Sequence, residues 1–263
     1  MKLPDNFTFT QQNLQDFVDC RFRFYLKYIK QLDWPAVESE PLVLQEFRME
    51  LGRQFHLLVQ RYLSGIDVPT LTASIVSPEL LAWWEAFMGL ELDRNSAIKS
   101  AEKTLSMPFK GYRLLAKYDL LLETETGRII IYDWKTSPRR PSPQVLQSRL
   151  QSRVYPFVLH HSRANQPVGE IEMRYWFPAD PQRPFQFEYS EKQFAWDEEY
   201  LSALIEEILT LSEKEALKTD DDKRCLYCRY RSLCDRGITA GELEPDNEQD
   251  FTDDDFNIDF EES

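Results

Sequence analysis

Asp119, Asp133 and Lys135 lie near the middle of the chain, and their types and spacing suit hydrolysis assisted by a divalent cation. Asp133 and Lys135 end an apolar run that begins at Ile129, and side chains two apart on a strand share a face, about 7 Å apart. Carboxylates offer hard oxygen ligands to Mg²⁺ or Mn²⁺. Such a cation lowers the pKa of a bound water and offsets the charge of a phosphoryl group under attack. Lys135 would hold the nucleophile or stabilise the developing charge. Taken alone, the same residues also fit the solvated polar end of a strand.

The segment from Tyr112 to Lys135 predicts two strands joined by a tight turn, a hairpin that would bring Asp119 beside Asp133. The turn is expected at residues 125–128, where Gly127 can adopt the positive φ that hairpin loops often require. Alternation along the first strand predicts two faces. One face would carry Leu114, Ala116, Tyr118, Leu120 and Leu122, and the other Leu115, Lys117, Asp119, Leu121 and Glu123.

Helices and further strands are predicted on both sides of this hairpin. Residues 10–32 predict one helix with Thr10 as its N-cap and Cys20 inside it. A helix over 42–63, ended by Gly65, would carry His56, and Pro78 begins a third helix through residue 88. A helix over 144–161, kinked or interrupted at Pro156, would carry Gln151 and Tyr155 on one face. Strands are expected from residue 97 and over 170–177 and 184–189, and a last helix over 192–218. This order predicts a mixed sheet with helices on its faces, in the α/β or α+β class.

The chain has four cysteines, and three of them follow a C-x2-C-x5-C pattern. Two thiolates three residues apart can hold one metal or one cluster, and four thiolates complete a closed site. A site that uses Cys20 together with Cys225, Cys228 and Cys234 would join the N-terminal helix to the C-terminal segment. Zinc and an iron–sulfur cluster both accept four thiolates, so the spacing leaves the occupant open. Reduced thiols without a metal are the other alternative, and disulfides are not expected in a cytosolic chain.

The formal net charge of −14 is unevenly distributed. Residues 241–263 hold eleven acidic and no basic residues, whereas the rest of the chain holds 34 acidic and 31 basic residues. Because phosphate contacts depend on local charge, the acidic total does not exclude DNA. The basic side chains form three local clusters: Arg21, Arg23, Lys27 and Lys30; Arg139, Arg140, Arg149 and Arg153; and Lys223, Arg224, Arg229, Arg231 and Arg236.

The composition is that of a globular protein, with 42% hydrophobic and 13% aromatic residues. The sequence contains no apolar run of the length that a membrane span needs, and its first residues, MKLPDNFTF, lack the apolar core of a signal peptide. We therefore expect a cytoplasmic protein without a membrane partner. The motif G-x-x-x-x-G-K-[ST] is absent, so any helicase partner would be a separate chain.

Taken together, these motifs resemble the RecB-like PD-(D/E)XK nucleases, in particular their iron–sulfur-containing branch. That branch includes the CRISPR-adaptation exonuclease and the nuclease domain of AddB. The matching motifs follow the family's order: Gly52-x-x-x-His56, Asp119, Asp133-Trp134-Lys135-Thr136 and Gln151-x-x-x-Tyr155, with one cysteine upstream and three downstream. The sequence departs from the family at Arg21, where Pro often follows the first cysteine, and at Gln60, where an acidic residue is common.

The resemblance implies a restriction-endonuclease-like core within a single nuclease domain over residues 1–241, followed by an acidic, disordered tail over 242–263. His56, Asp119, Asp133 and the Trp134 carbonyl would bind Mg²⁺ or Mn²⁺, and Lys135 would be the catalytic lysine. Gln151 and Tyr155 would serve the active site or position DNA. The four cysteines, Cys20 plus those within 225–234, would hold a 4Fe–4S cluster, with zinc as the alternative occupant.

These roles predict a metal-dependent DNA exonuclease acting on single strands or ends, in DNA repair, recombination or CRISPR adaptation. A helicase or a CRISPR-adaptation protein is a candidate partner. Two alternatives remain: a catalytically silent iron–sulfur scaffold that binds DNA within a helicase–nuclease-type complex, and a zinc-stapled protein without a nucleic-acid role. The tail alternates acidic residues with Phe and Ile, a composition that cannot build a core. It could imitate DNA, dock on a partner or act only as a solubilising segment.

Overall fold

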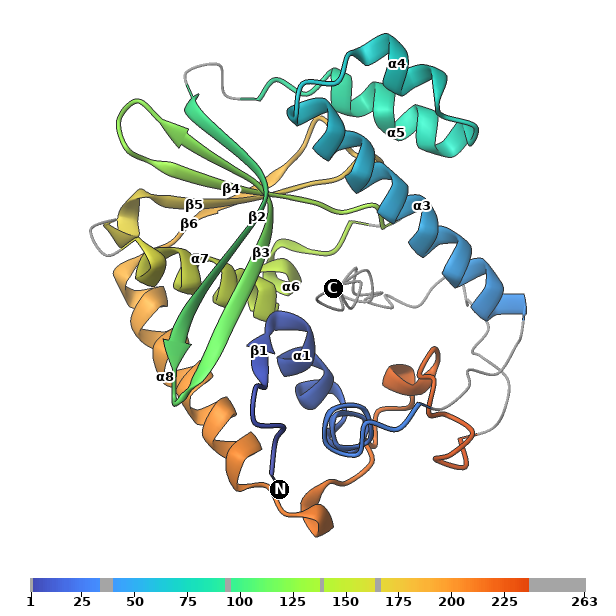
Figure 1. Cartoon of the computed structure of the whole chain (residues 1–263), viewed down its shortest axis with the longest axis vertical. Helices are drawn as coiled ribbons and strands as arrows, with labels where there is room; N and C mark the ends of the chain where they lie inside the picture. Colours follow the sequence, from blue (N-terminus) through green and yellow to red (C-terminus); the bar gives the residue numbers. More distant parts are fainter. Residues whose placement is uncertain (1, 34–39, 93–95, 138–139, 164–166, 237–263) are drawn as a thin grey trace.

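A six-stranded mixed sheet forms the centre of the molecule (Figure 1). The computed structural model describes residues 2–33, 40–92, 96–137, 140–163 and 167–236, with residues 40–42 and 96–99 described by their backbone alone. The predicted acidic tail therefore lies outside the described residues. The strands are β1 (Thr8–Thr10), β2 (Ser96–Phe109), β3 (Tyr112–Thr124), β4 (Ile129–Trp134), β5 (Ile171–Trp176) and β6 (Phe185–Glu188).

Strand β3 organises the sheet. One of its edges pairs with β2 in antiparallel fashion along almost its whole length. Its other edge is shared by β1, which runs parallel to it near residue 114, and by β4, which runs antiparallel from residue 120 onward. The β3–β4 hairpin was predicted from the sequence, and its turn has the expected positive φ of 87° at Gly127. Beyond β4 lie β5, parallel to it, and β6, antiparallel to β5.

The helices cover both faces of the sheet, so the predicted mixed sheet flanked by helices is confirmed. The α-helices are α1 (Gln11–Asp19), α2 (Arg21–Phe24), α3 (Glu40–Leu63), α4 (Val68–Ala73), α5 (Pro78–Met88), α6 (Pro143–Ser148), α7 (Leu150–Ser162) and α8 (Glu191–Thr210). Shorter turns are η1 (Tyr25–Ile29), η2 (Val168–Glu170), η3 (Glu213–Glu215) and η4 (Asp222–Cys225). Apolar residues of α1, α7 and α8 pack on one face, and those of α3, α4 and α5 pack on the other. Among the described residues, no helix has the length and apolar character needed to cross a bilayer.

The predicted alternation along β3 fails near Asp119. Tyr118 and Leu121 pack in the core beside α7, whereas Leu120 and Leu122 pack beside α3. The two faces therefore exchange between residues 118 and 120. On β2, Glu102 lies between the partners of these residues and has a positive φ of 51°. A non-glycine residue in that conformation interrupts the pleat, so simple alternation cannot continue through it.

The predicted N-terminal helix is also interrupted, at Cys20. Thr10 caps α1 as expected, in a capping box with Asn13. Cys20 then adopts an extended conformation (φ −162°, ψ 107°), and its Sγ accepts a hydrogen bond from the Arg23 N–H at the start of α2. Helical periodicity could not reveal this break because the cysteine itself serves as a helix cap.

Two other helix boundaries differ from the prediction. The helix over 144–161 is interrupted at Arg149, which is extended (ψ 144°), and α7 continues through Pro156. The last helix ends at Thr210, where Leu211 leaves the helical conformation, so the chain turns back toward α2 well before residue 218. The short helix α4 was not predicted. Asp67 caps it, and Pro69 lies in its first turn.

Candidate active site and cysteine pocket

The two aspartates lie where β3 and β4 separate. The paired register ends at Leu120 opposite Tyr132, so Asp119 and Asp133 occupy the next position on each strand. The Trp134 N–H donates to the Asp119 side chain, at Oδ2 and 2.8 Å. This bond takes the place of a backbone hydrogen bond between β3 and β4. The Lys135 N–H donates instead to the Trp176 carbonyl on β5, at 2.9 Å. The strands are thereby held apart at the point where the two carboxylates meet.

Asp133 is buried between a lysine and an amide. Lys135 Nζ lies 3.1 Å from Asp133 Oδ2, and both side chains are only 5% exposed. This contact confirms that the two residues share a face. Gln151 Nε2, on α7, donates to Asp133 Oδ1 at 2.5 Å. The burial of this group excludes the alternative of a solvated polar strand end.

His56 and Glu102 complete the group around Asp119. His56 Nδ1, on α3, lies 3.3 Å from Asp119 Oδ1. Each of His56, Glu102 and Asp119 offers a possible ligand atom, and these three atoms lie within 4.8 Å of one another. Glu102 was missed by the sequence analysis because it lies in β2, outside the recognised motifs. Register could have found it, since its neighbours Ala101 and Lys103 pair with Leu120 and Tyr118 on either side of Asp119. We call the residues His56, Glu102, Asp119, Asp133, Lys135 and Gln151 the acidic edge.

Burial and the charges of neighbouring groups together shift the pKa values of the acidic edge. Burial lowers the pKa of His56, but the carboxylates of Asp119, Asp133 and Glu102 outweigh that effect and raise it to about 9. Burial raises the pKa of Asp133 to about 7, against the attraction of Lys135. The pKa of Glu102 is raised by burial and by the charge of Asp119. His56 and the Trp134 N–H hold the pKa of Asp119 below its ordinary value, although burial opposes them.

These shifts and distances fit a divalent cation. Burial and the charge of Asp119 raise the pKa values of Asp133 and Glu102, and the surrounding carboxylates raise that of His56. Hard oxygens with one imidazole are suitable ligands for Mg²⁺ or Mn²⁺, and a bound cation would relieve the repulsion among them. The donor set present therefore fits the predicted metal.

Tyr155 and Trp134, two further predicted site residues, lie beside this group. The Tyr155 ring packs 5.1 Å from that of Tyr118, and the Tyr118 hydroxyl donates to the Tyr155 carbonyl at 2.9 Å. The Trp134 ring packs 5.3 Å from that of Phe87 on the α5 side of the sheet. Tyr155 thus supports the strand residue that precedes Asp119. The Trp134 carbonyl as a metal ligand stays a prediction.

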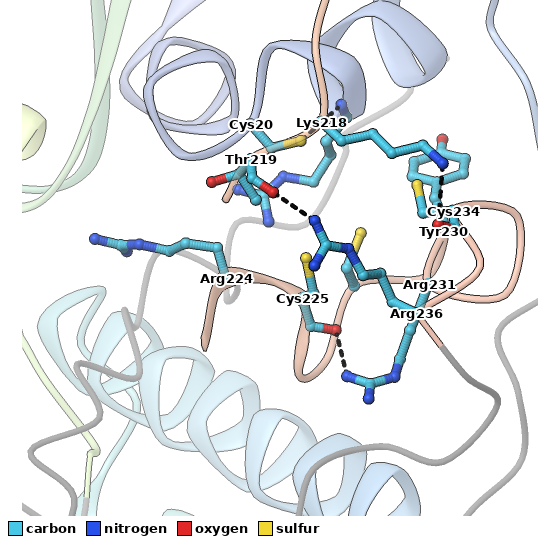
Figure 2. A pocket seen from close by; sticks show the side chains of 11 residues that line it. Cys20, Lys218, Thr219, Arg224, Cys225, Tyr230, Arg231, Cys234 and Arg236 are labelled. Atoms are coloured by element: carbon cyan, nitrogen blue, oxygen red, sulfur yellow. Dashed lines mark hydrogen bonds between the residues drawn. The ribbon is translucent and has the colours of Figure 1, made fainter. Parts of the chain in front are cut away.

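All four cysteines line a single small pocket, although Cys20 is about two hundred residues away from the others in sequence (Figure 2). The break between α1 and α2 brings Cys20 to it, and the segment around η4 supplies Cys225, Cys228 and Cys234. We call this the cysteine pocket. Burial first, and then the proximity of the other thiols, raises the pKa of Cys225 and raises that of Cys234 to about 11.

Cationic side chains surround these thiols. Arg23, Lys218, Arg224, Arg231 and Arg236 also line the pocket. Lys218 Nζ donates to the Cys234 carbonyl at 3.0 Å, and an Arg231 nitrogen donates to that of Cys225 at 3.1 Å (Figure 2). Four thiols in one pocket lined by cationic side chains form a donor set that fits a thiolate-bound metal or cluster.

Polar contacts tie the N-terminal segment to the residues that follow α8 around the pocket. The Phe22 N–H donates to the Leu217 carbonyl at 3.1 Å, and the Tyr230 hydroxyl donates to the Leu32 carbonyl at 2.9 Å. Arg224 lies 3.2 Å from Asp19 of α1. The junction predicted from the cysteine spacing therefore exists, and the protein's own side chains already make part of it.

The predicted basic clusters are partly used in internal ion pairs. Arg153 lies 2.6 Å from the fully buried Asp197 on α8, and its guanidinium lies 4.7 Å from the Tyr200 ring centroid. Arg23 lies 3.0 Å from Asp16 and 2.8 Å from Asp19. These arginines hold helices together, so sequence clustering overstated how many cations face solvent.

A mixed sheet between two helical layers, with carboxylates and a lysine where its central strands part, defines a restriction-endonuclease-like nuclease core. The comparison with protein families agrees. Residues 8–235 match the model of the PD-(D/E)XK nuclease superfamily, and the chain belongs to this superfamily.

Two solved structures are similar to this chain. A "Putative exonuclease" from Eubacterium rectale aligns with a TM-score of 0.51 and 11% identity, over 84% of this chain and 91% of that one. SSO0001 aligns with a TM-score of 0.42 and 17% identity, over 91% and 90% of the two chains. The first likeness concerns the fold, and at these identities neither transfers a substrate. A comparison with curated protein sequences found no match.

Proposed function

We propose that this protein is a divalent-metal-dependent deoxyribonuclease that cuts single-stranded DNA or DNA ends. The observation that carries the proposal is the convergence of the acidic edge, where Asp119 and Asp133 lie between His56 and Lys135. Burying so many ionisable groups together costs folding free energy because each loses hydration, and a bound cation would offset the repulsion among the carboxylates. End preference is supported only by the exonuclease name of the E. rectale neighbour.

Each residue of the acidic edge has a distinct role in this proposal. His56, Glu102, Asp119 and Asp133 would hold the cation, which supplies an activated water and charge neutralisation when bound. Gln151 fixes the Asp133 carboxylate through its hydrogen bond to Oδ1, while Oδ2 faces Lys135 Nζ. Lys135 is held by Asp133 on the same strand face, where its ammonium can stabilise charge that develops on the phosphoryl oxygens.

We further propose that the cysteine pocket holds a 4Fe–4S cluster through Cys20, Cys225, Cys228 and Cys234. The resemblance to the iron–sulfur branch supports iron over zinc, and the four thiols of one pocket support a single shared occupant. Its role would be structural, since it joins α1 and α2 to the C-terminal segment. A purified protein with broad visible absorption and about four iron atoms per chain is expected; zinc alone in elemental analysis would reject the cluster.

The direct test is cleavage of end-labelled single-stranded DNA with Mn²⁺ or Mg²⁺. Wild type should cut, and Asp133→Ala and Lys135→Ala should each lose at least about 10³-fold in rate, because several kcal/mol of transition-state stabilisation disappear. Glu206→Gln removes an exposed carboxylate on α8 and serves as the matched control, with an unchanged rate expected. The product ladder on each labelled end reports polarity and end dependence.

A contrary result would separate the alternatives. Wild type that retains its metal and binds DNA without cutting it would replace the nuclease by the scaffold alternative. Cleavage that persists in Asp133→Ala would place the catalytic site elsewhere. Binding to neither DNA nor RNA would favour a protein without a nucleic-acid role.

A further inference from the structure

A second group of charged side chains lies at the same edge of the sheet as Asp133 and Lys135. Strands β4 and β5 run parallel and pair up to Trp134 and Trp176, so the segments that follow them leave the sheet together. The segment after β4 carries Arg140, and the segment after β5 carries Asp180 and Arg183.

One carboxylate holds both arginines. Asp180 Oδ2 lies 3.3 Å from Arg140 Nη1 and 3.0 Å from Arg183 Nη2, and Asp180 Oδ1 accepts from Arg183 Nε at 3.1 Å. The Arg140 guanidinium also lies 6.0 Å from the ring centroid of the buried Phe177. We call Arg140, Asp180 and Arg183 the arginine rim.

The rim is restricted in backbone conformation, carries a net positive charge and reaches solvent mainly through Arg183. Prolines at 141, 143, 178, 181 and 184 restrict φ along both segments. Two guanidinium groups share one carboxylate, which leaves a net positive charge. The Arg183 side chain is 76% exposed and that of Arg140 is 24% exposed. Because Arg183 is largely exposed, its ion pair with Asp180 adds little to folding stability, so stability does not account for the position of Arg183.

Guanidinium groups fixed in this way suit a phosphate. Arginine presents planar N–H donors that match phosphate oxygens, and Asp180 uses only some of them. Preorganisation by the prolines and by Asp180 lowers the entropy lost when an anion binds. Arg140 comes after the end of β4 and Asp180 after the end of β5, so the rim lies at the same edge of the sheet as Asp133.

We propose that Arg140 and Arg183, oriented by Asp180, bind a backbone phosphate of the substrate strand adjacent to the phosphate being cleaved. This inference rests on the proposed nuclease function and adds positioning residues to it. Asp180 has two opposing effects: it aligns the guanidinium groups, and its charge repels the incoming phosphate. In Asp180→Asn the amide oxygen can still accept from arginine while the repulsion is gone, so substrate binding should tighten.

The test measures kcat and KM for a single-stranded oligonucleotide at several salt concentrations between about 50 and 200 mM. The double variant Arg140→Ala/Arg183→Ala should raise KM about tenfold at the low end of this range with kcat nearly unchanged. Its salt dependence should be shallower by about 0.7 in slope for each phosphate that the variant no longer binds. Asp180→Asn should lower KM about threefold. The change in opposite directions is the signature, since a purely structural rim would lose function in both variants.

Arg163→Ala is the matched control, because Arg163 also pairs with a carboxylate, Glu123 at 2.6 Å, but at the opposite end of β4. It should leave KM and the salt slope unchanged. If the double alanine variant fails to fold, Arg140→Lys/Arg183→Lys replaces it and should keep the salt slope while raising KM.

The two proposals fail in different ways. If wild type cuts DNA and the rim variants behave like Arg163→Ala, the rim proposal alone is rejected. A rise of KM in Asp180→Asn would reject it as well. If wild type neither binds nor cuts single-stranded DNA, both the rim proposal and the proposed nuclease function are rejected.

Discussion

The acidic edge and the cysteine pocket are the two proposed metal sites of this protein, yet they are assembled in different ways. The acidic edge takes Glu102, Asp119 and Asp133 from three strands that pair directly, and the surrounding apolar layers fix it. The cysteine pocket takes its ligands from the two ends of the described chain, which meet through polar contacts. The packed sheet therefore positions the acidic edge, whereas the cysteine pocket joins the N-terminal segment to the residues that follow α8.

The largest effect on activity is expected at the acidic edge. Asp119→Asn should lower kcat/KM by about 10³-fold, since several kcal/mol of metal-assisted stabilisation is lost. The thermal midpoint should hardly change, because the amide oxygen of Asn can still accept from the Trp134 N–H. Kinetics and calorimetry on the same preparation check both statements. A large fall in thermal stability would mean that this carboxylate is structural.

The cysteine pocket should respond in the opposite way. Cys20→Ser should lower the metal content and reduce the free energy of unfolding by about 3 kcal/mol or more, because binding energy of a structural metal is folding energy. Val18→Ser, two residues earlier on an exposed position of α1, should do neither. Elemental analysis and denaturant titration provide the readout. Full metal retention in Cys20→Ser would remove this cysteine from the ligand set.

Gln151 tests how tightly the acidic edge is supported. Gln151→Ala removes the hydrogen bond to Asp133 Oδ1 and should lower kcat by about 10- to 100-fold, the range typical of groups that orient a metal ligand. Gln147→Ala, on the exposed side of α6, is the control and should leave kcat as it is. An unchanged rate in Gln151→Ala would show that Lys135 alone suffices to orient the carboxylate.

The smallest effect is expected where the N-terminal segment begins. Thr10→Ala deletes the capping oxygen of α1 and should cost about 1 kcal/mol of stability. Because α1 leads to Cys20, metal should be lost from the cysteine pocket at lower denaturant concentration than in wild type, while kcat stays the same. Thr210→Ala, whose hydroxyl bonds only within α8, provides the comparison. Equal metal retention in both variants would uncouple the cap from the pocket.

Local spacing and turn chemistry predicted the parts of the site that are close in sequence. The hairpin and the shared face of Asp133 and Lys135 follow from strand periodicity, whereas the place of Gln151 beside them was implied by the family resemblance. What the sequence could not supply depends on conformation at single residues. Glu102 reaches the acidic edge through an irregular backbone position, and Cys20 reaches its pocket by leaving the helix. Neither departure has a periodic signal, because Cys20 caps α2 through its own Sγ and Glu102 pairs with Lys117 across the β2–β3 ladder.

The parallel pairing of β1 has a consequence for the order of folding. Thr8–Thr10 binds to β3 at residues 113–115, so the earliest strand must wait until more than one hundred further residues have been synthesised. Closing so large a loop costs entropy, whereas the β3–β4 hairpin closes locally. The hairpin that carries both aspartates should therefore form first, and α1 with Cys20 should dock later. Metal capture in the cysteine pocket, which also needs Cys234, would then be the final step of maturation.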